Sequence, residues 1–383
     1  MSHRIAVDLY NALIKLRPEW ASAKEDIADA EKGKAYVVRM SVPFSPLALK
    51  IAAMKVVFVA RYGPPEEVEF REAPTPSPAA GEVRIRVLAT AVTAADWRVR
   101  SGVMPRGFGA LRGIALGFGG PRKGVLGTDA AGVIDAVGAG VTRFKVGDPV
   151  LAFPGSAMGC HAEFLVMRAD GRVAPKPTNL SFEEAAALPF GGMTALDFLR
   201  RGEVQAGERV LVNGASGNVG SAAVQLAKHL GAHVTAVCSA TNASLVRSLG
   251  ADEVIDYATC DFAAGGARFD VVLDTVGNAP YRRVERVLAP RGRLLAVLAD
   301  LPAMFGAAFA GRTKSHRVVA GPASERAEDL LTLAELAAQG KLRPVIDQRF
   351  PFERIVDAYR VVDSGRKKGS VVLWLDPRAT LTK

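Results

Sequence analysis

The stretch that decides the fold is NGASGNVG, residues 213–220. It follows the apolar run 210–212 and precedes SAAVQLAK, residues 221–228, so the predicted order is strand, glycine turn, helix. Glycines recur at every third position: Gly214, Gly217 and Gly220. So tight a turn needs a residue without Cβ, phosphate oxygens must approach backbone N–H groups, and the helix must pack closely on its strand. The motif predicts that a dinucleotide pyrophosphate binds at the N-terminus of this helix.

A glycine-rich surface turn is the alternative interpretation of the same letters. The context favours the dinucleotide site, because Gly231 ends the predicted helix and a second apolar run, residues 233–238, follows it. This is the strand–helix–strand order of a parallel α/β unit.

Ser239, which ends the second predicted strand, bears on which dinucleotide binds. Enzymes that use NAD usually place Asp or Glu there to accept from the ribose 2′-hydroxyl. Here Ser239 opens a neutral stretch with Thr241 and Asn242, and the first acid is Asp252. Hydroxyls, an amide and the nearby Arg247 accommodate a 2′-phosphate that a carboxylate would repel. The sequence predicts NADPH, with NADH possible; the alternative is that Ser239 only ends a strand.

Length and composition limit the function classes. The chain has 383 residues, enough for two domains, and no apolar stretch approaches the roughly 20 residues that span a bilayer. Three widely spaced cysteines offer no disulfide framework. The formal charge is +10, but basic residues are interleaved with acids and form no aromatic-rich stripe. We expect a cytoplasmic protein without nucleic-acid or membrane partners.

The chain divides into three stretches. Residues 1–53 show no secretory signal and precede the apparent first strand, which opens at Met54; we expect a poorly ordered extension in which residues 5–16 could form an amphipathic helix. From Met54 to about Pro177 the pattern is β-rich, with frequent glycines. From Ser181 onward, helices and strands alternate. The predicted class is α/β.

With its segments in this order, the chain resembles the medium-chain dehydrogenase/reductase superfamily, in its zinc-free quinone oxidoreductase-like branch. The resemblance covers residues 54–375 and rests, besides the glycine turn, on VTAADWRVRSG from Val92, GTDAAGVIDAVGAGVTRFKVGDPV from Gly127, LSFEEAAALPFGGMTALDFL from Leu180 and the stretch from Gly340 to the final strand. It implies a GroES-like β-barrel catalytic domain, residues 54–180 completed by 325–377. It also implies a doubly wound Rossmann nucleotide-binding domain, residues 181–324, and a homodimer.

The resemblance makes zinc a question that the residues can address. Zinc-dependent members take a Cys early in the first domain and a His-Glu pair after the glycine that is Gly127 here. The early position falls at residues 93–97, which hold no Cys, and the pair reads Thr128-Asp129. A zinc site needs three or four convergent ligands, so Cys160 and His161 alone do not make one, and a structural role is expected for them. No metal is predicted.

Without a metal, the reaction that the resemblance implies is hydride transfer from NADPH to a quinone or an α,β-unsaturated carbonyl. By family position, Thr93 and Asp96 would provide polar contacts near the acceptor oxygen, as catalytic residues. Asp96 could instead be a helix N-cap. Two alternatives stay open: an NAD(P)-dependent alcohol dehydrogenase, and a nucleotide-binding protein without turnover.

Further cofactor contacts follow from the resemblance. Those in and after the glycine turn are Ser216, Gly217, Asn218 and Val219; those at the adenosine phosphate are Ser239, Thr241, Asn242 and Tyr257. Those nearer the adenine ribose or the nicotinamide are Thr194, Val276, Gly277 and Leu298. Tyr257 could instead cap the core. Lys367 or Lys368 could approach the cofactor, although a solvated turn lysine is the favoured interpretation.

Overall fold

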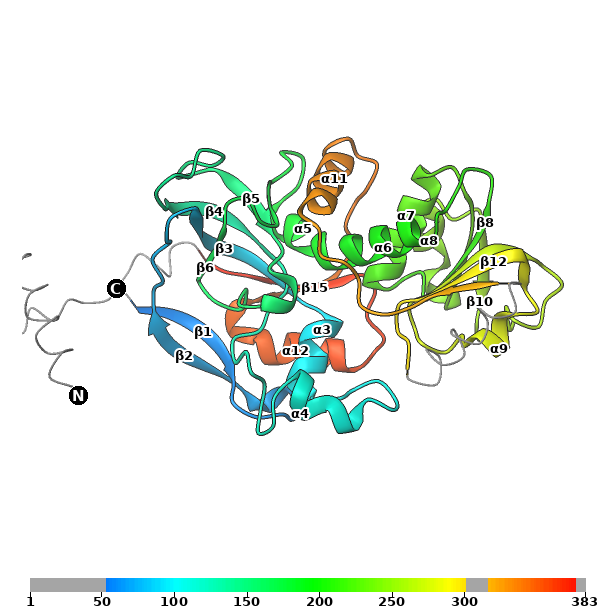
Figure 1. The fold of residues 1–383 in the computed structure, drawn as a ribbon, viewed down its shortest axis with the longest axis horizontal. Coiled ribbons are helices and arrows are strands. Elements are labelled where there is room, and N and C mark those ends of the chain that lie inside the picture. The colour runs from blue at the N-terminus through cyan, green and yellow to red at the C-terminus, as the bar shows by residue number, and fades with distance from the viewer. Residues whose placement is uncertain (1–52, 301–315, 377–383) are drawn as a thin grey trace, which may run out of the picture. The chain divides into compact units, whose positions relative to one another are not determined.

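The structure is a computed structural model that describes residues 53–300 and 316–376, all within one compact unit, Ile51–Lys383 (Figure 1). The predicted helix at residues 5–16 lies outside the described residues.

A six-stranded sheet carries the glycine turn. Its strands pair in the order β10-β9-β8-β11-β12-β13, and every pairing is parallel. Counted along the chain this is 3-2-1-4-5-6, the strand order of the doubly wound Rossmann fold, which is the fold that the resemblance implied. The strands are β8 (Arg209–Asn213), β9 (His233–Cys238), β10 (Glu253–Asp256), β11 (Phe269–Asp274), β12 (Leu288–Ala296) and β13 (Arg317–Val319). The order reverses between β8 and β11, and ligands of such sheets bind at that edge.

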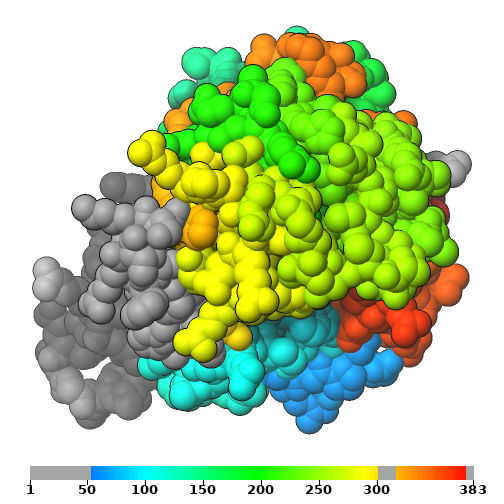
Figure 2. Space-filling model, turned by 90° about the vertical axis from the view of Figure 1, so that its right-hand side faces the viewer, coloured from blue at the N-terminus to red at the C-terminus, as the bar shows by residue number. Residues whose placement is uncertain are grey.

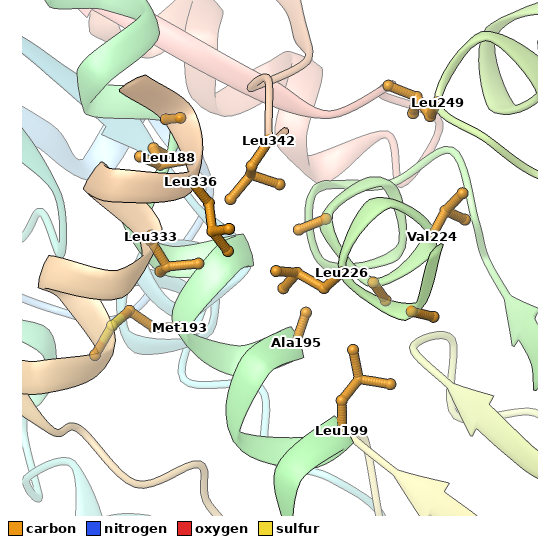
Figure 3. Packing of buried hydrophobic residues seen from close by; sticks show 14 of the residues in the cluster. Leu188, Met193, Ala195, Leu199, Val224, Leu226, Leu249, Leu333, Leu336 and Leu342 are labelled. Carbon is orange, nitrogen blue, oxygen red and sulfur yellow. The ribbon is translucent and has the colours of Figure 1, made fainter. Parts of the chain in front are cut away.

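Helices accompany this sheet. They are α6 (Pro189–Arg201), α7 (Asn218–His229), α8 (Ala243–Ser248), α9 (Tyr281–Val284) and α11 (Ala327–Ala338). In Figure 3 leucine side chains from α7 and α11, such as Leu226 and Leu333, point toward the same interior space beside α6. Because parallel sheets are covered on both faces, their strands read as apolar runs such as 210–212 rather than as alternating patterns.

The remaining strands form the catalytic sheet, in the order β14-β15-β3-β4-β5-β7, with β6 also on β3 and a separate β1-β2 pair. They are β1 (Ala53–Val59), β2 (Val68–Pro74), β3 (Glu82–Val92), β4 (Ala130–Val137), β5 (Pro149–Ala152), β6 (Phe164–Arg168), β7 (Val173–Pro175), β14 (Ile346–Pro351) and β15 (Ser370–Trp374). Figure 1 shows the red strand β15 beside the blue β3, with which it pairs antiparallel. The C-terminal stretch therefore returns to the first sheet.

Short helices pack on the catalytic sheet. They are α3 (Ala94–Ser101), α4 (Arg112–Ala115), α5 (Phe182–Ala187) and α12 (Ile355–Asp363). One hydrophobic cluster joins this sheet to the Rossmann helices, because it contains Ala89 of β3, Val372 of β15 and Leu333 of α11 together. The two sheets thus share a continuous apolar core.

Candidate active site

The glycine turn adopts the geometry that its residues predicted. Gly214 has a positive φ of 79°, which a residue with a side chain rarely adopts. A Cβ added to Gly220 would lie 2.1 Å from the Gly214 carbonyl oxygen, so the third glycine lets α7 pack closely on the turn. The fold of the protein itself therefore requires glycine at both positions.

Gly217 differs from its two neighbours. It is the N-cap of α7 with an ordinary extended backbone, and a Cβ there would meet only the Gly214 carbonyl oxygen, at 3.4 Å. The protein therefore does not itself require glycine at this position. The space that a Cβ would fill lies at a helix N-terminus with free N–H groups, which is where a phosphate binds. These residues fit a dinucleotide pyrophosphate.

The carboxyl ends of β8 and β9 bring the predicted adenosine-phosphate residues together. Asn242 donates from Nδ2 to Ser216 Oγ at 3.0 Å, and the hydroxyls of Ser239 and Thr241 lie 2.9 Å apart. Burial and then Asp256 raise the pKa of the Cys238 thiol, and the charge of Arg247 opposes them, so one negative and one positive side chain lie near the end of β9. The described residues give Arg247 no ion pair.

Asp274, at the end of β11, is a residue that the sequence reasoning missed. It is buried, and its carboxylate accepts from the N–H groups of Val276 (3.0 Å), Gly277 (3.1 Å) and Ala279 (2.9 Å) and from Asn213 Nδ2 (2.9 Å). These bonds fix the loop that carries the predicted contacts Val276 and Gly277. An Asp that ends an apolar strand just before a glycine loop was the available signal.

The segment before β15 reaches the glycine turn, a contact that the sequence did not predict. Gly369 N–H donates to the Ser216 carbonyl at 2.8 Å, and Asn218 Nδ2 donates to Ser370 Oγ at 2.8 Å. The side-chain amide of Asn218 is therefore turned to the catalytic sheet, which leaves its backbone N–H for a phosphate. Lys367 is half-buried and donates to the Gly369 carbonyl at 2.5 Å, so it is no solvated turn lysine. Burial lowers the pKa of Lys367 to about 8.

Of the other predicted cofactor residues, Val219 lies in the first turn of α7 and Leu298 lies beside Gly277, where an added Cβ would be 3.2 Å from the Leu298 Cβ. Thr194 uses its hydroxyl within α6, donating to the Phe190 carbonyl at 2.8 Å. Tyr257 is 64% exposed, so the alternative that it caps the core is wrong.

Four buried polar residues form a chain in the catalytic domain. Thr93 Oγ donates to Asp96 Oδ2 at 2.7 Å, Thr93 Oγ lies 3.2 Å from Thr128 Oγ, and Thr128 Oγ lies 2.7 Å from Asp129 Oδ2. At one end, Asp96 also accepts from the N–H groups of Thr93 and Gly127, each at 2.8 Å. At the other, Asp129 accepts from Phe190 N–H in the first turn of α6, at 2.6 Å.

These contacts correct one sequence interpretation. Thr93, not Asp96, is the N-cap of α3, and Asp96 is the third helical residue of a capping box, which accepts from the Thr93 N–H. Both are buried, and the Asp96 carboxylate accepts from three donors within the protein. Asp96 therefore positions Thr93 and Gly127, which makes direct contact with an acceptor oxygen unfavourable.

The chain has three oxygen–oxygen contacts, and two ionised carboxylates would leave it one hydrogen short. The hydroxyls of Thr93 and Thr128 would each donate to their own carboxylate, leaving no hydrogen between them. A proton on Asp129 supplies the third, since Asp129 can then donate to Thr128, Thr128 to Thr93, and Thr93 to Asp96. Burial, with repulsion from Asp96, raises the pKa of Asp129 to about 8 against the opposing hydrogen bonds. The geometry and the pKa agree on a neutral Asp129 near pH 7.

Cys160 and His161 pack beside this chain. Both are buried; His161 Nε2 lies 3.0 Å from the Ala91 carbonyl, and its ring packs edge-on against Tyr359. Burial raises the pKa of the Cys160 thiol well above its usual range. These contacts agree with the structural role expected for the pair. Among residues 53–300 and 316–376, three or more His, Cys, Asp or Glu side chains nowhere gather as metal ligands would.

Two protein families match this chain. The family described as an alcohol dehydrogenase GroES-like domain matches residues 79–178, and that described as a zinc-binding dehydrogenase matches residues 249–373. The chloroplast envelope quinone oxidoreductase homolog of Arabidopsis thaliana is 32% identical over 324 residues, 80% of this chain and 93% of that protein. The 2-methylene-furan-3-one reductase of Solanum lycopersicum is 35% identical over 303 residues, 76% of this chain and 71% of that protein.

Solved structures show the same relationship. The quinone oxidoreductase from Coxiella burnetii has a TM-score of 0.75 at 29% identity, covering 85% of this chain and all of that one. A structure described as an NAD-dependent alcohol dehydrogenase has a TM-score of 0.69 at 30% identity, covering 84% of this chain and all of that one. With its GroES-like catalytic domain and its Rossmann sheet, the chain belongs to the medium-chain dehydrogenase/reductase superfamily of oxidoreductases.

Proposed function

We propose that this protein is an NADPH-dependent oxidoreductase that transfers hydride to a quinone or an α,β-unsaturated carbonyl without zinc. The observation that carries the proposal is the turn at Gly217, where an added Cβ beside a helix N-terminus would meet a single protein atom, the Gly214 carbonyl oxygen at 3.4 Å. A bound nicotinamide cofactor would supply the hydride, and the chain's residues would orient it. The relatives whose names refer to quinone and furanone reduction support this acceptor class.

The preference for NADPH is supported by the neutral side chains that follow β9. Two hydroxyls and the Asn242 amide gather there, and among the described residues no carboxylate is bonded to them. We expect Ser239→Asp to shift the NADPH/NADH ratio of kcat/KM toward NADH by at least tenfold, since the carboxylate would repel the 2′-phosphate. An unchanged ratio would remove this residue from the cofactor site.

Catalysis without zinc is supported by the chain of Thr93, Thr128 and the two aspartates. At the positions where the resemblance implies metal ligands, hydroxyls satisfy each other and a protonated Asp129, instead of converging on an ion. We propose that Thr93 and Asp96 act as positioning residues: they fix the Gly127 backbone and, through Asp129, the start of α6. Thr194, one of the predicted cofactor contacts, lies on α6 and is positioned with it.

The function is tested with a panel of substrates. Oxidation of NADPH and of NADH is measured with quinones and enones, and reduction of NADP⁺ is measured with secondary alcohols. We expect NADPH oxidation with quinones or enones. Turnover of alcohols alone would favour the alcohol dehydrogenase that one solved neighbour is described as. Tight NADPH binding with no turnover would favour a nucleotide-binding protein instead. The expected homodimer and cytoplasmic location also stay proposals, which light scattering and cell fractionation would test.

A further inference from the structure

The segment between Val103 and Lys123 has an unusual surface. Four of its large apolar side chains are exposed: Val103 (49%), Leu111 (47%), Ile114 (64%) and Phe118 (81%). Phe118 is the most exposed large hydrophobic residue in the described part of the chain. Isolated exposed apolar residues are ordinary, but a gathering of them on one short segment marks a contact surface.

The other exposed residues of the segment are cationic, alanine or glycine. The cations are Arg106, Arg112, Arg122 and Lys123. No Asp or Glu occurs anywhere between Asp96 and Asp129, and within the described residues no carboxylate pairs with any of these four side chains. The exposed surface of the segment thus combines apolar and positive groups with no negative charge.

Backbone contacts hold this surface in place. Tyr62 donates from its hydroxyl to the Gly117 carbonyl at 2.9 Å, and Arg122 N–H donates to the Leu116 carbonyl at 2.7 Å. The Arg112 guanidinium lies 5.1 Å from the centre of the Tyr62 ring. Figure 1 shows α4 and its flanking loops at the lower edge of the ribbon, and Figure 2 shows cyan atoms of this region exposed at the lower edge of the molecular surface. The apolar side chains are therefore presented outward by an anchored segment.

We propose that the segment from Val103 to Lys123 binds the surface of an anionic lipid bilayer. Apolar side chains entering the interface, next to cations that meet lipid phosphates, are the composition of interfacial membrane contacts. A nucleic acid would use the cations but leave Ile114 and Phe118 in water, which is why the lipid surface is favoured. None of the described helices is long and apolar enough to cross a membrane, so this contact is peripheral.

The contact suggests a substrate class, in a step that rests on the proposed function. A quinone dissolved in lipid would reach an enzyme seated on the bilayer without crossing water. The acceptor would then be a lipophilic quinone rather than a small water-soluble enone.

The test is sedimentation of the full chain with phosphatidylcholine vesicles, with or without phosphatidylglycerol, at low and high salt. We expect binding only to the anionic vesicles, weakened by salt. Lys123→Glu should weaken it by roughly 10- to 30-fold, at about one fivefold factor per unit of charge. Ile114→Asp should weaken it by at least about tenfold, because a charge would enter the apolar interface.

Matched controls separate this surface from the general positive charge. Lys341→Glu makes the same charge change at another exposed position, and Val146→Asp the same apolar-to-acid change at a side chain that is 61% exposed. Both should bind as the wild type does. Equal losses in Ile114→Asp and Val146→Asp, or no binding of the wild type to anionic vesicles, would overturn the proposal.

Activity distinguishes this inference from the proposed function. Ile114→Asp should reduce a short-chain quinone in buffer at the wild-type rate but a long-chain quinone in vesicles several-fold more slowly. A wild type that binds vesicles but reduces no quinone would contradict the proposed function and leave the membrane contact standing. A wild type that reduces quinones but does not bind anionic vesicles would contradict the membrane contact and leave the proposed function standing.

Discussion

A neutral Asp129 completes the hydrogen bonds between two buried threonines and a second buried aspartate, and the fold makes neutrality favourable by excluding water. The pKa of Asp129 is raised to about 8 from its ordinary 3.8, so near pH 7 the residue is largely protonated. Between pH 3.8 and about pH 8, the folded state keeps a proton on Asp129 that the unfolded state releases. Stability therefore falls as the pH rises from about 4 to about 8, by at most about 1.4 kcal/mol per pH unit.

Replacing Asp129 with Asn removes this pH dependence. The Asn amide can accept from Phe190 N–H and donate to Thr128, which reproduces the protonated acid. We expect the melting temperature of Asp129→Asn, relative to the wild type, to rise steadily between pH 5 and pH 8. Asp170→Asn is the control: Asp170 is exposed and its pKa lies below its usual value, so its difference from the wild type should be flat above pH 5. A flat difference for Asp129→Asn as well would mean that Asp129 is ionised in the fold.

The glycine turn gives a second prediction, because glycine is needed at Gly217 and at Gly220 for different reasons. Gly217→Ala should cost about 1 kcal/mol or less of stability, since the backbone is ordinary and the new Cβ meets little protein. It should nevertheless weaken NADPH binding by more than tenfold, because that Cβ occupies the phosphate approach. Gly220→Ala should instead destabilise the fold by several kcal/mol, since its Cβ would clash with the Gly214 carbonyl.

Calorimetric melting and NADPH titration separate the two variants. Unchanged NADPH affinity in Gly217→Ala would show that the turn does not bind the cofactor. A stable Gly220→Ala would show that the turn is looser than its geometry indicates.

Among the elements, α3 and α12 are held together by one buried arginine. Arg100 of α3 is fully buried, donates to both carboxylate oxygens of Asp363 at 2.6 Å and to the Gly63 carbonyl, and lies 5.0 Å from the centre of the Tyr359 ring. This cluster fixes α12, the helix that leads into Lys367 and β15, against the catalytic domain. The C-terminal return to the first sheet therefore depends on it.

Arg100→Met should lower the free energy of unfolding by about 1–3 kcal/mol, because the Gly63 carbonyl and Asp363, whose side chain is 27% exposed, lose the donors of a buried guanidinium. Arg360→Met is the matched comparison on α12: its pair with Glu66, at 2.8 Å, is exposed, so the loss should stay below about 1 kcal/mol. Urea denaturation measures both. Similar losses in the two variants would show that burial adds nothing to the Arg100 cluster.

The sequence could predict those features whose residues lie close together along the chain, and it could not predict contacts between distant segments. The glycine turn, the flanking strands β8 and β9 and the neutral Ser239 all lie within residues 209–239, so periodicity and turn chemistry identified them. Arg100 and Asp363 are separated by 263 positions, and the Ser216–Gly369 contact also joins distant segments, so nothing local announced them. Asp96 was assigned to the site by position, and only the packing shows that it is buried and accepts from three protein donors.

Across the whole molecule, one connected set of contacts links the two sheets. Asp129 binds the start of α6, where a Cβ added to Gly191 would lie 2.6 Å from the Asn218 carbonyl oxygen, and Asn218 begins the helix after the glycine turn. The buried polar chain and the glycine turn thus both contact the start of α6. The fold class predicted from the sequence, GroES-like catalytic domain and Rossmann sheet, is confirmed.

Catalysis without zinc is tested by measuring zinc content and NADPH-dependent quinone reduction on the same sample, before and after treatment with a chelator. We expect substoichiometric zinc and an unchanged rate, since hydroxyls stand where metal ligands would. Stoichiometric zinc, with activity lost on chelation and restored only by adding the metal back, would contradict the account.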